Sequence, residues 1–256
     1  MTIINALKQG AVVLIALFSL SANSADVALI IDDIGYRQTD AAAFQLPSEV
    51  TFSILPHTPY STEFAHRAAQ QGREVMLHMP MEALAGNKLG PGALTTELTS
   101  PAIQQTLNHA LASVPNAVGL NNHMGSRLTQ MTRPMTATME FLRQQQMFFI
   151  DSRTTRYSRA ETIAQQTGLA SARRHVFLDH YQDKRQIRFQ FERLIRIAKK
   201  HQRAIGIAHP YPVTLEFLSE HLEELQARGI RLLPASELLS RYYRPEIARS
   251  AQFAEE

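Results

Sequence analysis

The sequence predicts a single α/β domain of parallel strands, folded as a closed or nearly closed barrel. From residue 26 onward, short and almost continuous apolar runs alternate with longer amphipathic stretches. That alternation is typical of parallel strands buried on both faces and connected by helices. No linker rich in Pro, Gly or Ser divides the chain, and its 256 residues suffice for one core of barrel size.

Each predicted strand is a short run dominated by apolar residues. Runs of this length and composition fit strands better than helices, which need longer periodic stretches. The eight runs are 27–31, 50–55, 74–79, 117–121, 148–151, 175–178, 204–208 and 230–233.

The predicted helices lie between these runs and carry recognisable end signals. Ser100 is expected to cap a helix that continues to about residue 113, with Pro101 at its first position. Gly229 is expected to end the last helix before the final strand. The segment 86–99 contains Gly-Pro-Gly and predicts a loop over one end of the domain. The other expected helices are 134–146, 158–166, 183–202 and 214–228.

Residues 1–25 have the features of a secretory signal peptide. Lys8 gives a positive start, 11–20 is mostly apolar, and small residues follow up to Ala25. An uncleaved membrane anchor is the alternative, but the run is shorter than the ~18–20 residues that a bilayer crossing needs. We therefore expect a protein secreted to the periplasm, without a membrane span after cleavage. The barrel would then cover 26–240, and a polar C-terminal tail would cover 241–256.

Composition excludes several kinds of chemistry. The chain has no cysteine, which excludes disulfides, thiolate-bound zinc and thiol nucleophiles. A metal would have to be held by Asp, Glu or some of the 10 histidines. The 26 Lys and Arg residues against 23 Asp and Glu residues give a net charge of +3, an excess too small to indicate a nucleic-acid partner.

Polar side chains gather where the predicted strands end. A single polar strand end is commonly a turn cap, and a single histidine is commonly a core residue. Here six of the eight predicted strands end in Asp or His, and the carboxyl ends of parallel barrel strands share one mouth. Carboxylates and imidazoles that meet there suit a metal such as Zn²⁺. The candidates in chain order are Asp32, Asp33, His78, Glu82, Asn122, His123, Gly125, Ser126, Asp151, Asp179 and His209.

Four of these strand ends resemble motifs of the polysaccharide deacetylases of the nodulation-factor deacetylase type, and of their divergent bacterial branch in particular. The motifs are IIDDIG at 30–35, LHMPME at 77–82, NNHMGS at 121–126 and FIDSRT at 149–154. The resemblance implies a distorted (β/α)₇ barrel, a divalent metal that is usually zinc, and an acetylated glycan or oligosaccharide as substrate.

The resemblance also implies roles for individual residues. Asp33 and His78 would be metal ligands, Asp32 the catalytic base and His209 the catalytic acid. The family's second motif histidine is replaced here by Glu82. We therefore infer that His123 supplies the second imidazole.

Several assignments stay open between alternatives. Glu82 is a candidate for a further metal ligand or for a partner that orients His78. The roles of the two adjacent aspartates could also be exchanged, because the sequence does not fix their side-chain directions.

Two further roles complete the expected site. Either Asp151 or Asp179 would hold His209 in the required tautomer. Asn122, or a backbone N–H near Gly125 and Ser126, would bind the oxyanion.

The predicted function is a metal-dependent carbohydrate deacetylase that removes N-acetyl or O-acetyl groups from a glycan. The alternative is a non-catalytic carbohydrate-binding or envelope-regulatory protein on the same scaffold. The missing motif histidine and the absence of tryptophan favour that alternative. A metal hydrolase of esters or phosphoesters is a third reading, for which a phosphoesterase would favour a paired-metal site.

Overall fold

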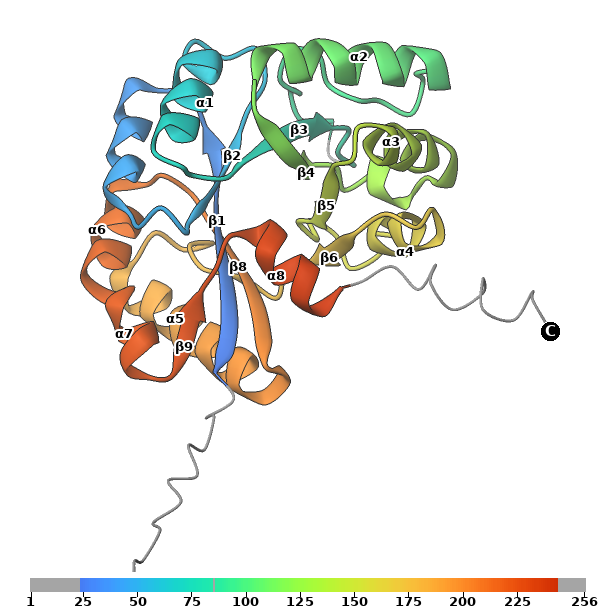
Figure 1. The fold of residues 1–256 in the computed structure, drawn as a ribbon. Helices are drawn as coiled ribbons and strands as arrows, with labels where there is room; N and C mark the ends of the chain where they lie inside the picture. The colour runs from blue at the N-terminus through green and yellow to red at the C-terminus, as the bar shows by residue number, and fades with distance from the viewer. Residues whose placement is uncertain (1–23, 85, 244–256) are drawn as a thin grey trace, which may run out of the picture.

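The computed structural model describes residues 24–84 and 86–243. They form one parallel β-sheet curled into a half-barrel, with the connecting helices around the outside (Figure 1). The prediction of an α/β fold with a distorted barrel of parallel strands is confirmed. The predicted signal peptide, apart from its last two residues, and the tail from residue 244 lie outside the described residues.

The sheet has nine strands, and their order places the first strand near its centre. From one end to the other the order is β6-β5-β4-β3-β2-β1-β8-β7, and β9 pairs with the start of β1. Neighbouring strands pair in parallel. The bounds are β1 Ala25–Ile34, β2 Thr51–Ile54, β3 Val75–Met81, β4 Ala117–Met124, β5 Phe148–Asp151, β6 Ser171–Arg173, β7 Val176–Phe177, β8 Arg203–Ala208 and β9 Ile230–Leu232.

No strand pairing closes the curled sheet into a full barrel in the described chain. Its two end strands, β6 and β7, are consecutive and are joined only by Arg174 and His175. The joining residues bond to strands on either side: the Arg174 N–H donates to the Asp151 carbonyl and the His175 N–H to the Ile205 carbonyl, both at 2.9 Å. Their side chains add to this, since Arg174 Nε donates to the Ser152 carbonyl at 2.7 Å and His175 Nδ1 accepts from the Ile205 N–H at 3.0 Å. With three and two residues, β6 and β7 are too short to complete a barrel by pairing.

The helices include elements that the sequence pattern did not predict. Helices α1 and α8 and the 3₁₀ helix η1 are additional, and the expected helix 214–228 is interrupted at Leu222. Thr99, rather than Ser100, caps α2 through its side chain. The helices are η1 Gln38–Gln45, α1 Ser61–Gln70, α2 Ser100–Ser113, η2 Leu128–Gln130, α3 Thr132–Gln144, α4 Ala160–Gln166, α5 Lys184–His201, α6 Pro212–His221, α7 Glu223–Ala227 and α8 Ala235–Tyr242.

The C-terminal end of the domain lies slightly beyond the expected boundary. Helix α8 continues two residues past residue 240, so the start of the predicted tail is helical. Across the part of the chain that the structure describes, no helix is both long enough and apolar enough to cross a bilayer.

Strand alternation explains why the polar residues collect at one end of the barrel. Ala28, Ile30 and Asp32 share one face of β1, just as Met76 and His78 share one face of β3. The apolar members of these rows pack with α8 in a buried cluster. Helix α8 lies at the amino-terminal strand ends, where the Ala235 N–H donates to Thr51 Oγ1. The polar members therefore lie at the opposite end, which is the mouth of the barrel.

Candidate metal centre and active site

The adjacent carboxylates Asp32 and Asp33 both face the mouth because the end of β1 is irregular. The pairing of β1 with β2 shifts register between Ile31 and Ile34, and Asp33 has φ 60°. This left-handed backbone breaks the alternation that would send neighbouring side chains to opposite faces. As a result, Asp33 Oδ1 lies 3.1 Å and Asp32 Oδ2 lies 3.7 Å from Nε2 of His78.

Three ligand atoms from three neighbouring strands converge at this point. His123 Nδ1 lies 2.9 Å from Asp33 Oδ1 and 3.2 Å from His78 Nε2. The three atoms all lie within 4.8 Å of one another. Asp33 Oδ1 is buried, and both imidazole nitrogens lie within 3.1 Å of it. A buried carboxylate oxygen of this kind between two imidazoles fits a divalent cation, and the donor set is one that zinc accepts.

The side chain of Asn121 links Asp32 to His78. Its Nδ2 donates to Asp32 Oδ1 at 2.7 Å, and its Oδ1 accepts from His78 Nδ1 at 2.7 Å. Because an ionised carboxylate only accepts, the first contact fixes the amide orientation and the second keeps the His78 proton on Nδ1. Ser53 Oγ donates to the same amide oxygen. Nε2 of His78 is thereby directed toward Asp33 and His123.

The sequence reasoning assigned Asn121 no role, although the residue stands in one of the quoted motifs. The signal that could have found it is strand alternation. Asn121 shares the inward face of β4 with Gly119, whereas its neighbour Asn122 does not.

His209 follows β8 and is held by Asp179. Nδ1 of His209 lies 3.0 Å from Asp179 Oδ1, and the His209 backbone N–H donates to Oδ2 at 2.7 Å. Thr214 Oγ1 donates to the same Oδ2 at 3.0 Å. Nε2 of His209 then faces the aspartates, 3.9 Å from Asp33 Oδ2. Of the two carboxylates considered for this role, the structure therefore brings Asp179 to His209.

Asp151 is committed to another task. Its Oδ1 accepts from the Arg153 N–H at 2.8 Å, and its Oδ2 accepts from Ser158 Oγ at 2.7 Å. The Asp151 side chain therefore braces the loop that follows β5.

The electrostatics of the metal-free site separate the two aspartates. Burial raises the pKa of Asp32 above its usual value, although the charges of His78 and His209 oppose the shift. Burial would also raise the pKa of Asp33, but the adjacent His123 and His78 lower it well below its usual range. Asp33 is thus suited to stay ionised as a ligand, and Asp32 to accept a proton.

Both histidines that face these carboxylates hold their protons more strongly than a free imidazole. Burial disfavours the charged form of His78, but Asp32 and Asp33 outweigh it and raise the pKa to about 9. Burial likewise opposes the charge on His209, yet the hydrogen bond that its ring donates to Asp179 and the nearby carboxylates raise its pKa. His209 is thus poised to donate a proton at neutral pH.

Metal binding is expected to release a proton from His78. The ring is protonated at neutral pH without metal and must give up the Nε2 proton to become a ligand. We expect release of about one proton per metal at pH 7, and a zinc affinity that rises about tenfold per pH unit toward pH 9. Isothermal titration in buffers of different ionisation enthalpy measures both quantities. An affinity independent of pH from 6 to 8 would contradict the assignment of His78.

Glu82 does not join the cluster, so the structure gives no support to its use as a further ligand. Its Oε2 accepts from both the N–H and the hydroxyl of Thr96, at 2.6 and 2.7 Å, and its Oε1 lies 3.2 Å from Arg127. These contacts hold the loop after β3 against the loop after β4. The side chain makes no contact with His78 in the described structure, so it does not orient that ring either.

The three residues expected to bind the oxyanion instead shape the turn after β4. Asn122 Nδ2 donates to the Met124 carbonyl, and its Oδ1 accepts from the Ser152 N–H. Ser126 Oγ accepts from the Leu84 N–H, and the carbonyl of Gly125 accepts from Thr129. The turn follows His123 almost directly, so these contacts hold the end of β4 that carries this proposed ligand.

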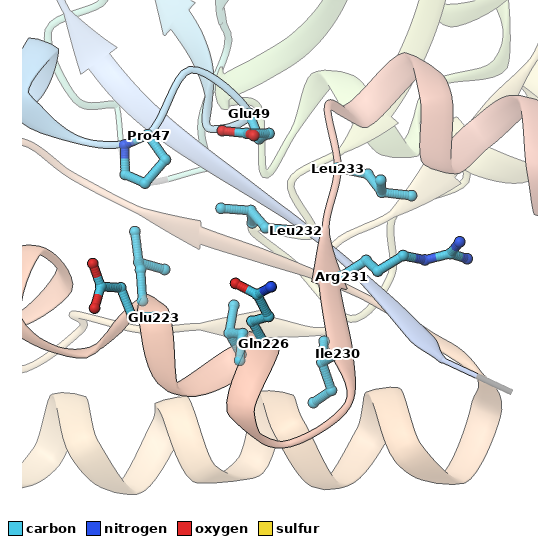
Figure 2. A pocket seen from close by; sticks show the side chains of 10 residues that line it. Pro47, Glu49, Glu223, Gln226, Ile230, Arg231, Leu232 and Leu233 are labelled. Carbon is cyan, nitrogen blue, oxygen red and sulfur yellow. The ribbon is translucent and has the colours of Figure 1, made fainter. Parts of the chain in front are cut away.

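A pocket of about 340 Å³ opens beside the cluster. Asp33 and His123 form part of its wall, and the loops after β1 and β8 form much of the rest. A second pocket of about 360 Å³ lies near β9, at the other end of the barrel (Figure 2). It has no histidine in its lining, and its one arginine, Arg231, points away toward Asp26. The chemistry is therefore concentrated at the mouth.

Solved structures with the same fold include proteins of different activity. An uncharacterized protein from Agrobacterium tumefaciens aligns with a TM-score of 0.81 and 24% identity over 85% of this chain and 90% of its own. A CE4 family pseudoenzyme from Bacillus anthracis has a TM-score of 0.55 and 16% identity, over 85% of this chain and 66% of its own. The catalytic domain of a peptidoglycan N-acetylglucosamine deacetylase from Eubacterium rectale has a TM-score of 0.52 and 13% identity, over 82% of this chain and 88% of its own.

Sequence relatives and a family model give the family. An uncharacterized protein from Haemophilus influenzae is 38% identical over 208 residues, which are 81% of this chain and 74% of that protein. The protein YibQ from Escherichia coli is 37% identical over 215 residues, which are 84% and 67% of the two chains. The model of the divergent polysaccharide deacetylases matches residues 29–239. The chain therefore belongs to the divergent polysaccharide deacetylase family.

Proposed function

We propose that this protein is a metal-dependent hydrolase that removes acetyl groups from a glycan. The observation that carries the proposal is the arrangement at the mouth. An Asp-His-His cluster, in which His78 is buried and Asp33 and His123 are partly exposed, stands between a carboxylate with a raised pKa, Asp32, and a histidine with a raised pKa, His209. Metal-assisted hydrolysis of an amide needs a proton acceptor and a proton donor on either side of the reacting carbonyl.

Asp33, His78 and His123 would hold the metal, and Zn²⁺ is the ion that this donor set suits best. A metal bound there would supply Lewis-acid chemistry, polarising the acyl oxygen and lowering the pKa of a water. Asn121 and Asp32 keep the His78 ring in the tautomer that exposes Nε2.

Asp32 and His209 would then move the protons. Asp32 accepts a proton from the attacking water, because its buried carboxylate has a raised pKa. His209 donates a proton from Nε2 to the leaving nitrogen, while Asp179 holds Nδ1 and stabilises the imidazolium. The products are acetic acid and a free amine, which become acetate and ammonium at neutral pH. Transfer of the Asp32 proton to His209 through solvent restores both groups.

The proposed place of action is the periplasm. The support is the charge, the mostly apolar run and the small residues of the first 25 residues, which are the features of a secretory leader. A glycan of the cell envelope is a substrate that a protein there would reach.

The test is the release of acetate from N-acetylated chitooligosaccharides and peptidoglycan fragments. We expect the zinc-loaded protein to release acetate, a chelator to stop the reaction and added zinc to restore it. The matched control is Asp32→Asn, which should keep the metal and lose turnover, because Asp32 is placed as the base and not as a ligand. Acetate release that survives complete removal of metal would refute the proposal.

A non-catalytic role on the same scaffold is the second candidate. The observation that favours it is structural similarity to a CE4 family pseudoenzyme, together with Glu82 at the position of the missing motif histidine. Under this reading the protein would bind metal and glycan without releasing acetate. The same experiment separates the two functions.

A further inference from the structure

The pocket beside the metal cluster contains one exposed arginine, Arg37. It comes from the loop after β1 and lines the same wall as Tyr36, Tyr211 and the proposed ligands Asp33 and His123. No acidic side chain in 24–84 or 86–243 forms an ion pair with its guanidinium. A cation without a partner in a pocket that opens on the reacting centre is a candidate for recognition of an anion.

The loop that presents Arg37 is fixed in place. Asp40 is buried, and its Oδ2 accepts from the N–H groups of Gly35 and Arg37 at 3.1 and 2.9 Å. The Gly35 carbonyl accepts from Thr58 Oγ1 at 2.7 Å. Gly35 has φ 108°, and a Cβ there would come within 2.9 Å of that Thr58 oxygen. The backbone of Arg37 is therefore preorganised, and the entropy lost on binding is confined to its side chain.

Tyr211 gives the same pocket an aromatic surface and a polar tip. Its ring stacks against that of His209, with centroids 5.5 Å apart and planes inclined by 28°. Among the described groups none forms a hydrogen bond with its hydroxyl, which leaves that group available to a ligand. On the same wall Tyr36 is 61% exposed. Tyrosine thus supplies the apolar ring surface that a sugar face needs in a chain without tryptophan.

The two acids of this pocket make their hydrogen bonds and close contacts with groups other than the guanidinium of Arg37. Asp33 lies in contact with the two imidazoles of the metal cluster. The carboxylate of Asp40 is directed to the backbone of its own loop. An anionic group that enters the pocket would therefore meet the guanidinium of Arg37.

We propose that Arg37 binds a carboxylate carried by the glycan next to the scissile acetyl group, so that the substrate is an acidic N-acetylated sugar. A carboxylate matches the planar fork of a guanidinium and can accept two hydrogen bonds from it. Tyr36 and Tyr211 would hold the ring of the same sugar. The inference rests on the proposed function only for the position of the acetyl group.

The test compares two sugars that differ by one carboxylate. N-acetylmuramic acid is N-acetylglucosamine with an added lactyl ether, and its methyl ester restores a neutral group of similar size. Titrated into the zinc-loaded protein, the acid is expected to bind about tenfold more tightly than either neutral sugar. The preference should shrink as salt is raised. A disaccharide of glucuronate and N-acetylglucosamine tests whether the carboxylate lies instead on the neighbouring sugar.

Variants assign the preference to one side chain. Arg37→Gln should remove the preference and leave the affinity for N-acetylglucosamine within about twofold, since only the charge-assisted contact is lost. Arg185→Gln on α5 is the matched control, because that side chain is 94% exposed and does not line the pocket. The control should keep the full preference.

Measuring acetate in the same samples separates this inference from the proposed function. Preferential binding of the acid without acetate release would support the role of Arg37 and refute the hydrolase. Acetate release with equal affinity for acid and neutral sugars would support the hydrolase and refute the role of Arg37. A preference that survives Arg37→Gln, or no binding of any of these sugars at millimolar concentration, would overturn the assignment of Arg37.

Discussion

Replacing Asp33 with asparagine is expected to lower zinc affinity by more than about 100-fold, beyond the 10–100-fold that loss of an outer partner costs. Asp33 contributes the sole carboxylate of the three-residue cluster, and its Oδ1 is the atom that both imidazoles approach. Asparagine keeps the shape and tolerates the left-handed backbone at φ 60°, whereas alanine would add strain. The lost affinity can therefore be attributed to the carboxylate. Metal content after dialysis, and competition with a chromophoric chelator, measure the effect.

Glu82→Gln is the matched control for this prediction. It also removes one carboxylate near the mouth, but Glu82 bonds Thr96 and Arg127 and not the cluster. We expect this variant to bind one zinc with affinity close to that of the parent and to lose only part of its loop order. Full metal content in Asp33→Asn, together with loss of metal in Glu82→Gln, would exchange the roles of the two residues and refute the site.

The strands were predictable because burial on both faces leaves continuous apolar runs. β5 begins and ends at the expected residues, and β1 differs mainly because it continues through the two aspartates. β6 could not be found, since three residues that include Ser171 and Arg173 carry no apolar pattern. Helix α1 was not expected, although its buried residues Phe64, Ala65 and Ala68 recur at helical spacing, so its pattern was present in the sequence.

The metal site was predictable for a similar reason. Its residues follow strands directly, and parallel strands end at one mouth, so Asp33, His78 and His123 had to come near one another. The positioning contacts were not predictable, because they depend on atomic distances rather than on residue type. The backbone turn at Asp33 and the amide of Asn121 are two of these.

The choice between Asp151 and Asp179 needed the structure as well. Both follow strands, and both are buried carboxylates. Only the structure shows that the strand order places β7 beside β8, so that Asp179 is adjacent to His209. Asp151 ends β5, which β4, β3, β2 and β1 separate from β8 in the sheet order.

Replacing Asp179 with asparagine is expected to lower kcat by about 10²–10⁴, the range that a positioned general acid contributes. The hydrogen bond that the His209 ring donates to Asp179 is the main influence that raises the pKa of His209 against burial. Without it the pKa falls, so the protonated form of His209 is lost at a lower pH. The alkaline limb of the pH–rate profile should therefore move to lower pH, while zinc content stays unchanged.

Asp151→Asn distinguishes this positioning role from a merely structural one. It also removes a buried carboxylate beyond a strand end, but one whose partners are the Arg153 N–H and Ser158. We expect it to reduce thermal stability and to leave the alkaline limb in place, because His209 keeps its partner. A shift of that limb in Asp151→Asn, with none in Asp179→Asn, would mean that Asp179 does not set the proton affinity of His209. The proposed acid would then have to be sought elsewhere at the mouth.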